Sequence, residues 1–286
     1  MANISNQLQT SLAAAERIFA LLEEKEERKE RPTVTTKEAC IKGNILFDQV
    51  KFGYGPGQPL VLKNFSTCIK AGQKVALVGP TGAGKTTIVK LLMRFYEVQE
   101  GAIYIDGYDI RDFSRQDLRS QFGMVLQDTW LYHGTILDNI RYGKLTASEE
   151  EVIAAAKAAQ VDRFVRTLPQ GYRMVLNEEA SNVSQGQKQL LTIARAILAD
   201  TKLLILDEAT SSVDTRTEVL IQKAMDNLMQ NRTSFIIAHR LSTIRNADLI
   251  VCLQDGEIVE QGTHQELMAR KGFYTALYNS QFARIS

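Results

Sequence analysis

The feature that most constrains this chain is the glycine-rich segment GPTGAGKT at residues 79–86. It follows the apolar run KVALV and precedes TTIVKLLMRFY, which reads as a helix. A strand, a glycine-rich loop and a helix in this order form a cradle in which backbone N–H groups surround phosphate oxygens. The positive end of the following helix points at the same place. The segment therefore predicts a nucleoside-triphosphate site.

Within this loop, Gly82 and Gly84 let the backbone approach phosphate without interference from a Cβ atom. Lys85 is expected to reach the β- and γ-phosphates, and the Thr86 hydroxyl to ligate Mg²⁺. ATP and Mg²⁺ are the ligands predicted here. The candidate nucleotide-binding residues of the loop are Gly79, Thr81, Gly82, Ala83, Gly84, Lys85, Thr86 and Thr87.

A second chemical signal lies at residues 202–214, KLLILDEATSSVD, where two carboxylates end an apolar run. Asp207 is predicted to be a magnesium ligand. Glu208 is predicted to orient and polarise the attacking water. An Asp-Glu pair at a strand end is weak evidence alone, but about 120 residues after a phosphate loop it indicates hydrolysis.

The remaining pattern predicts an α/β fold. Several runs are continuously apolar, which is typical of strands buried on both faces, and helical segments lie between them. The strands near 45–70 and 100–106 predict an antiparallel flank beside a mostly parallel central sheet. Residues 128–200 predict an inserted α-helical subdomain, with helices over 149–160, 161–168 and 184–198. The predicted strands are 45–52, 74–79, 102–106, 122–127, 202–207, 233–239, 249–256 and 257–262.

The first 31 residues form a separate part. Residues 4–22 have the spacing of an amphipathic helix, and a charged run over 23–31 follows it as a solvated linker. The apolar stripe must pack on the domain or on a partner, and the residues do not decide between them. No apolar run here is long enough to cross a bilayer, so any action at a membrane requires another segment or chain.

Composition excludes some classes of function. The formal net charge is +1, so nucleic acid is not expected as a partner. The 3 cysteines are far apart, which argues against a disulfide framework and a zinc site.

From residue 44 to 282 the chain resembles the ATP-binding cassette (ABC) family of P-loop NTPases. The decisive segment is VSQGQ at residues 183–187, here called the signature segment, which is similar to the family sequence L-S-G-G-Q. The resemblance makes 44–282 an ABC ATP-binding domain. It implies adenine stacking by Tyr54, Mg²⁺ and water contacts by Gln127, a loop at Ser211–Asp214 that crosses to a second subunit, and a γ-phosphate contact by His239.

In this family two cassettes face each other, and the resemblance implies a composite site. The phosphate loop of one subunit and the signature segment of the other would hold one ATP. Through the resemblance, Ser184, Gln185, Gly186, Gln187 and Asp214 become candidate nucleotide-binding residues. The catalytic candidates are Glu208, His239, Gln127 and Lys85, and the metal candidates are Thr86, Gln127 and Asp207.

The chain departs from the family pattern at the signature segment. Val183 replaces a leucine, and Gln185 replaces a glycine and could crowd the nucleotide or make an added contact. Residues 177–182 lack the glycines of the usual exporter loop. Such variation is typical of heterodimeric exporters, but homodimer and heterodimer both stay open.

The exporter type is implied by the N-terminal helix, by WLYHGTILDNI at 130–140 and by the C-terminal tail. The first of these resembles the cytoplasmic end of a last transmembrane helix, so we expect a membrane-spanning half outside this chain. Trp130, Leu131 and Tyr132 are then expected to contact it. The implied location is the cytoplasmic face of the cell (inner) membrane. An importer ATPase and a soluble, non-transport ABC ATPase are the alternatives, and the sequence does not identify a transported substrate.

Overall fold

A computed structural model describes residues 2–24, 30, 32–55, 57–126, 129–207, 213–237 and 241–281 of the chain. The chain is divided into two compact units, residues 1–31 and residues 32–286. The first unit contains one helix, α1 (Ala2–Glu23), on which the large apolar side chains of the described residues are exposed. Among the described residues, no helix combines the length and the apolar character that a membrane crossing requires.

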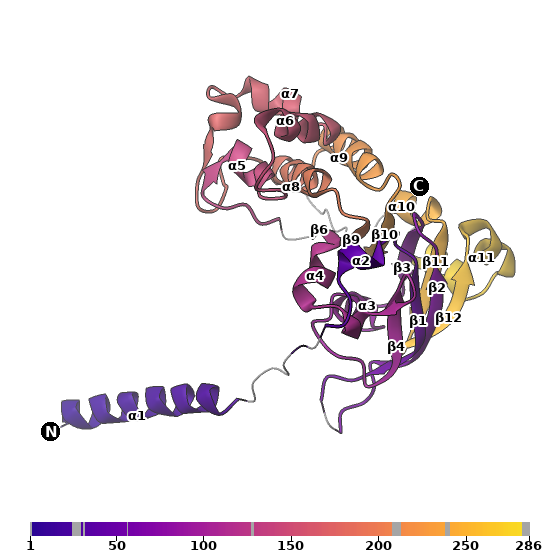
Figure 1. The fold of residues 1–286 in the computed structure, drawn as a ribbon, viewed down its shortest axis with the longest axis horizontal. Coiled ribbons are helices and arrows are strands. Elements are labelled where there is room, and N and C mark those ends of the chain that lie inside the picture. The colour runs from indigo at the N-terminus through magenta and orange to yellow at the C-terminus, as the bar shows by residue number, and fades with distance from the viewer. Residues whose placement is uncertain are drawn as a thin grey trace. The chain divides into compact units, whose positions relative to one another are not determined.

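A six-stranded sheet forms the centre of the second unit (Figure 1). Its order is β12-β11-β3-β10-β9-β6; the last five are parallel, and β12 runs antiparallel to β11 at the edge. The strands are β3 (Lys74–Val78), β6 (Phe122–Val125), β9 (Leu203–Asp207), β10 (Thr233–Ile237), β11 (Leu249–Gln254) and β12 (Glu257–Gly262). This confirms the fold class predicted from the sequence.

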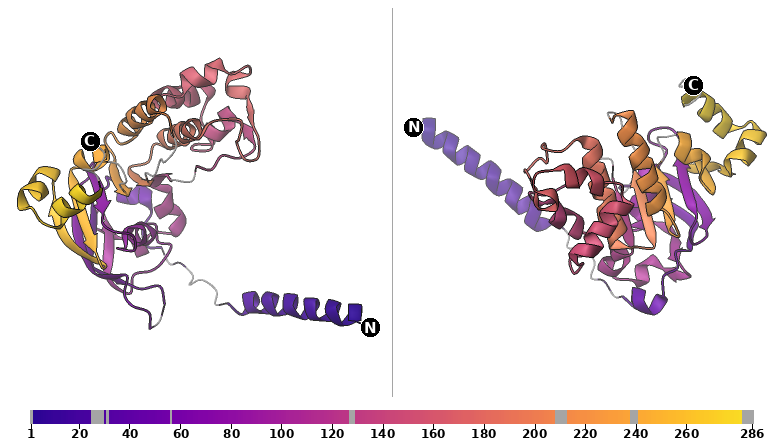
Figure 2. Two further views of the ribbon diagram at one scale, coloured as in Figure 1. Left: turned by 180° about the vertical axis from the view of Figure 1, so that it is seen from behind. Right: turned by 90° about the horizontal axis from the view of Figure 1, so that it is seen from above.

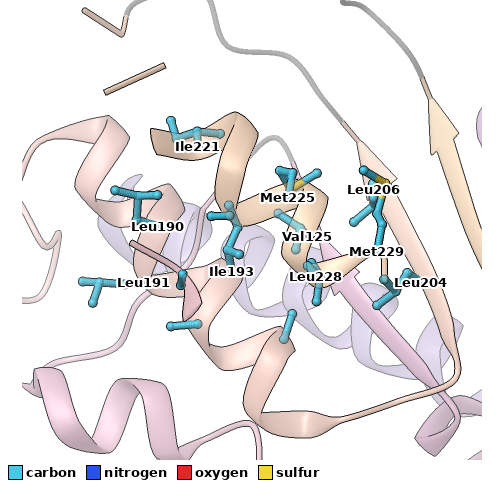
Figure 3. Close-up of a cluster of buried hydrophobic side chains, with 14 of the residues drawn as sticks. Val125, Leu190, Leu191, Ile193, Leu204, Leu206, Ile221, Met225, Leu228 and Met229 are labelled. Atoms are coloured by element: carbon cyan, nitrogen blue, oxygen red, sulfur yellow. The ribbon is translucent and has the colours of Figure 1, made fainter. Parts of the chain in front are cut away.

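The central strands are continuously apolar because each one supplies two hydrophobic cores. Alternate residues point to opposite faces of a sheet. Thus Leu204, Leu206 and Ile236 enter one buried cluster, while Ile205 and Phe235 enter the other. The first cluster also contains side chains of α8 (Gln185–Ala199) and α9 (Thr215–Leu228), which Figure 3 shows together with Leu204 and Leu206. The second cluster contains side chains of α3 (Lys85–Leu92) and of the flanking sheet.

The flanking sheet is antiparallel, as the sequence predicts, with the order β2-β1-β4-β5. Phe47 of β1 packs edge-on against Phe65 of β2 at 4.9 Å and against Phe235 of β10 at 6.3 Å between ring centroids. The contact with Phe235 attaches the flank to the parallel sheet. Its strands are β1 (Ile45–Phe52), β2 (Leu62–Ile69), β4 (Glu100–Ile105) and β5 (Tyr108–Asp109).

A mostly helical segment is inserted between β6 and β9, which are hydrogen-bonded neighbours in the sheet. Its helices gather at one end of the second unit in both views of Figure 2. A two-stranded antiparallel ribbon inside it, β7 with β8, is not predicted by the sequence pattern. Besides α8, the elements are β7 (Gly134–Thr135), α5 (Ile136–Arg141), α6 (Glu149–Ala158), α7 (Asp162–Thr167), η2 (Gly171–Arg173) and β8 (Val175–Leu176).

The remaining elements are short and lie at the periphery. Near the C-terminal end, the His264 Nδ1 atom lies 2.7 Å from the Tyr274 hydroxyl, and this contact connects α11 (His264–Arg270) to α12 (Phe273–Gln281). The others are α2 (Thr36–Ala39), η1 (Ile110–Asp112), α4 (Arg115–Ser120) and α10 (Leu241–Arg245).

Candidate functional site

A cavity of about 480 Å³ opens at the carboxyl ends of β3, β9 and β10, where the glycine-rich loop connects β3 to α3. Gly82 and Gly84 have positive φ angles of 85° and 104°, which a residue with a Cβ atom rarely adopts. A Cβ atom built on Gly82 meets nothing within 4 Å, so open space lies over its backbone. The cavity is lined by Tyr54, Val61, Thr81, Gly82, Gly84, Lys85, Thr86, Thr87, Asp207 and Ile237.

Lys85 is the first residue of α3 and folds back over the loop. Its Nζ atom donates to the Gly79 carbonyl at 2.7 Å and to the Pro80 carbonyl at 2.8 Å. Burial lowers the pKa of this ammonium group, while the negative charge of Asp207 acts to raise it. A phosphate that enters the cavity would offer the ammonium group stronger, charged acceptors than these two carbonyls.

Asp207 ends β9 and lines the same cavity as Thr86. These two side chains supply oxygen donors of the kind that Mg²⁺ combines with water and substrate phosphates. No cluster of three or more His, Cys, Asp or Glu side chains suited to a metal occurs in the part of the chain that the structure describes. The pair therefore fits Mg²⁺ held jointly with a nucleotide, and does not form a complete protein cage.

Three predicted site residues, Gln127, Glu208 and His239, lie outside the described residues. Their neighbours in the chain are described: Asp207 immediately precedes Glu208 and lines the cavity, as does Ile237, two residues before His239. The segment Ser211–Ser212 also lies outside the described residues. The roles of all of them stay predictions.

The signature segment begins α8. Val183 is buried, and Ser184 is the N-cap residue. The Ser184 Oγ atom accepts the Gln187 N–H at 3.3 Å, and the Ser184 N–H donates to the Gln187 Oε1 atom at 2.8 Å. This capping box satisfies the Gln187 amide inside the chain. The Ser184 hydroxyl hydrogen and the amides that precede Gln187 at the helix start stay available for an anion.

Gly186 has a structural reason to be glycine. A Cβ atom at this position would lie 2.4 Å from the Thr217 Cγ2 atom and 3.0 Å from the Val213 Cγ1 atom. The start of α8 therefore packs directly against the start of α9. Asp214 is the N-cap of α9 and accepts the Thr217 N–H at 3.0 Å, and hydrogen bonds from Thr217 lower the pKa of its carboxyl group.

Gln185, which departs from the family pattern, makes an added contact. Its Nε2 atom donates to the Thr129 Oγ1 atom at 3.2 Å. Thr129 lies two residues after Gln127 in the chain. The side chain thus connects the signature segment to the stretch that follows Gln127.

The structure corrects one of three predicted membrane-domain contacts. Leu131 is only 4% exposed and belongs to the core cluster, so it cannot contact another chain. Trp130 is 58% exposed, and Tyr132 is half-buried beside it, with 6.1 Å between their ring centroids. The Arg195 guanidinium lies 5.9 Å from the Trp130 ring centroid and donates to the Trp130 carbonyl at 3.1 Å.

Residues 184–187 are not among the described residues that line the cavity around Lys85. In the described structure the signature segment and the cavity around Lys85 are therefore two separate places on the chain. Sequence reasoning missed Lys90 and Tyr96, which contact Tyr54 of the cavity, and Thr129, which contacts Gln185 of the signature segment. Only the helical spacing of Lys90 from Thr87 carries a signal in the sequence, because the other contacts depend on tertiary structure.

The parallel sheet, the phosphate loop at its carboxyl edge and the helical insertion together define a P-loop nucleotide-binding protein. Residues 62–211 match the protein-family model described as ABC transporter. The chain belongs to this family, and it is an ABC ATP-binding domain, which confirms the family predicted from the sequence.

Its relatives are much longer proteins. The chain is 57% identical over 274 residues to the fatty acid ABC transporter ATP-binding/permease protein of Mycobacterium bovis, covering 96% of this chain and 43% of that protein. It is 48% identical over 281 residues to the ATP-dependent lipid A-core flippase of Desulfotalea psychrophila, and the match covers 98% of this chain and 49% of that protein. The chain thus spans about half the length of these curated relatives.

One similar solved structure is that of a bacterial Atm1-family ABC exporter with ATP bound. The TM-score is 0.82 at 40% sequence identity, with 96% of this chain and 48% of that chain covered. The likeness covers the central sheet, the antiparallel flank and the helical insertion, because nearly the whole chain takes part.

Proposed function

We propose that this chain binds and hydrolyses Mg²⁺-ATP and powers an ABC exporter through ATP-driven pairing of two cassettes. The observation that carries the proposal is the separation of two half-sites, the cavity around Lys85 and the exposed N-terminus of α8 at Ser184. A single chain offers a triphosphate only one of them. A second cassette, identical or different, supplies the other.

The residues of the cavity divide the work of binding. Lys85 and the loop amides hold the β- and γ-phosphates, and Tyr54 stacks on the base. Thr86 and Asp207, with Gln127, hold Mg²⁺, which when bound neutralises charge on the phosphate oxygens. Glu208 orients the attacking water and accepts its proton. His239 donates to the γ-phosphate, where charge is greatest.

The half-site at Ser184 belongs to the partner's nucleotide in this proposal. The Ser184 hydroxyl and the first amides of α8 donate to the γ-phosphate across the interface, helped by the positive end of the helix. Gln187 supports Ser184 through the capping box. Loss of the γ-phosphate removes the acceptor of these bonds, so the two cassettes separate after hydrolysis.

The exporter function is inferred from relatives such as the Mycobacterium bovis protein, whose name describes an ATP-binding part and a permease part. A membrane-spanning domain is then the second partner, and it holds the cassette at the cytoplasmic face of the cell (inner) membrane. Exposed Trp130 and half-buried Tyr132 are candidates for this contact. No feature of the described residues favours nucleic acid, an importer or a non-transport ATPase.

The test is a Glu208→Gln variant of this chain, studied with Mg²⁺-ATP. Turnover should fall about 10²–10⁴-fold, because a positioned base is lost. ATP affinity should persist, and light scattering after gel filtration should show a dimer that ADP does not support. Lys85→Ala should weaken ATP binding and abolish the dimer.

A further variant isolates the second half-site. Ser184→Arg in the Glu208→Gln background places a bulky cation at the start of α8 and leaves the cavity around Lys85 intact. It should bind ATP as a monomer. A dimer that survives Ser184→Arg, or a Glu208→Gln chain that stays monomeric at saturating ATP, would refute the composite site.

A further inference from the structure

We propose that Lys90 and Thr87, both on α3, position the ring of Tyr54 for base stacking, with Tyr96 as a packing partner. This inference rests on the proposed binding of ATP in the cavity around Lys85. It assigns Lys90 as a positioning residue for base recognition, acting through Tyr54. The helix that starts in the phosphate loop would then set the place of the base as well.

The first observation is a hydrogen bond at the tip of the Tyr54 side chain. Its hydroxyl lies 3.0 Å from the Thr87 Oγ1 atom, in a partly buried setting. Thr87 is itself buried in the first turn of α3. A tyrosine on a loop is thereby attached at its far end to a residue whose own position is set by the core.

The second observation concerns the ring. The Lys90 Nζ atom lies 5.5 Å from the centroid of Tyr54 and 6.0 Å from that of Tyr96, both within the range of a cation–π contact. The Tyr54 ring also meets Tyr96 edge-on at 5.1 Å and Phe52 edge-on at 5.0 Å between centroids. Such edge-to-face pairs are favourable and directional. The ring is therefore held by neighbours as well as through its hydroxyl.

The third observation is that these supports share one element. Lys85, Thr87 and Lys90 all belong to α3, and Thr87 and Lys90 are three residues apart, so they lie on the same helix face. Tyr54 lines the cavity together with Lys85, whereas Lys90 is not among its lining residues. Lys90 is thus placed to act on the base through the Tyr54 ring and not as another phosphate ligand.

The experiment compares two ligands that share a triphosphate, ATP and inorganic tripolyphosphate, by calorimetry on this chain. The quantity is the ratio of their dissociation constants, in which the effect of removing one positive charge largely cancels. Lys90→Met should reduce the preference for ATP about two- to fivefold, the range for a partly exposed cation–π contact. Lys90→Arg keeps a cation over the ring and should retain the preference.

The Tyr54→Ala background tests whether Lys90 acts through the ring. In that background Lys90→Met should leave the ratio unchanged, a result that a general effect on folding or on the loop would not give. Tyr54→Phe removes only the hydroxyl and should also reduce the preference for ATP. Adding Thr87→Val to Tyr54→Phe should reduce the preference for ATP no further, because either change alone removes the hydrogen bond between Tyr54 and Thr87.

The outcomes separate the two proposals. If the wild-type chain fails to bind ATP, the proposed function fails. If it binds ATP but Lys90→Met leaves the ratio unchanged, or changes it equally with and without Tyr54, the positioning role of Lys90 is overturned. Thermal unfolding of each variant checks that the fold is retained, and Lys90→Gln replaces Lys90→Met if the latter does not fold.

Discussion

Gly186→Ala should destabilise this domain even though alanine is the better helix former. The added Cβ atom would lie 2.4 Å from the Thr217 Cγ2 atom and 3.0 Å from the Val213 Cγ1 atom. Carbon atoms in contact normally stay about 3.5–4.0 Å apart, so one of the two helix starts must shift. Overpacking of this kind costs about 1–3 kcal/mol. Replacing glycine by alanine in a helix stabilises it by at most about 1 kcal/mol, and by less in the first turn. The cost of the clash is therefore expected to exceed this gain.

The measurement is the free energy of unfolding in urea, with thermal unfolding beside it. A net loss of about 1–2 kcal/mol corresponds to a fall in Tm of roughly 2–8 °C for a domain of this size. Thr217→Ser removes the clashing methyl group and supplies the control. In the Thr217→Ser background, Gly186→Ala should cost clearly less, because only the Val213 contact at 3.0 Å remains. The same loss in both backgrounds, or no loss in the wild-type background, would refute the packing account of Gly186.

Three further predictions follow from the described contacts. Leu131→Ala should lower the free energy of unfolding by about 2–5 kcal/mol because Leu131 is buried. Trp130→Ala, at the exposed neighbour, should cost less than half as much, and equal losses would contradict the placement of Leu131 in the core. Gln185→Ala and Thr129→Val should each change the free energy of unfolding by no more than about 1 kcal/mol. A double-mutant cycle should show that the two effects are not additive, and strict additivity would mean that the hydrogen bond does not form in solution. Burial, and then the positive charge of Arg245, lowers the pKa of His264 from its ordinary 6.5. The neutral form therefore stabilises the fold above that pH, and this contribution is lost as the pH falls below it. The stability advantage of the wild-type chain over His264→Asn should shrink between pH 7 and pH 5, and a constant difference would refute this prediction.

Much of the fold could be predicted because its signals are local and repeated. The continuous apolar runs of β9 and β10 indicate strands buried on both faces, and each strand does supply two cores. The order of the strands could not be read from the runs, because pairing depends on contacts between distant segments. The ribbon of β7 and β8 was missed for a similar reason, since two-residue strands carry no periodicity.

The candidate site divides in the same way. Lys85, Thr86 and Asp207 could be predicted because the phosphate loop and the strand-end carboxylate are continuous in sequence, and the structure brings all three to one cavity. Leu131 was misassigned because its position beside Trp130 says nothing about which of them faces the core. Lys90 was missed because its partner, Tyr54, is 36 residues away in the chain.

Gly186 shows how one residue can satisfy two requirements that the sequence alone does not separate. The resemblance makes this glycine a candidate nucleotide-binding residue, while the structure explains it by the close approach of Thr217. The packing has a mechanical consequence, because α9 begins directly after the stretch that carries Glu208 and the segment to Asp214. A displacement of the start of α8 cannot leave the start of α9 unmoved while the two remain in contact. If the start of α8 binds a partner's nucleotide as proposed, we therefore expect that binding to shift the start of α9 as well.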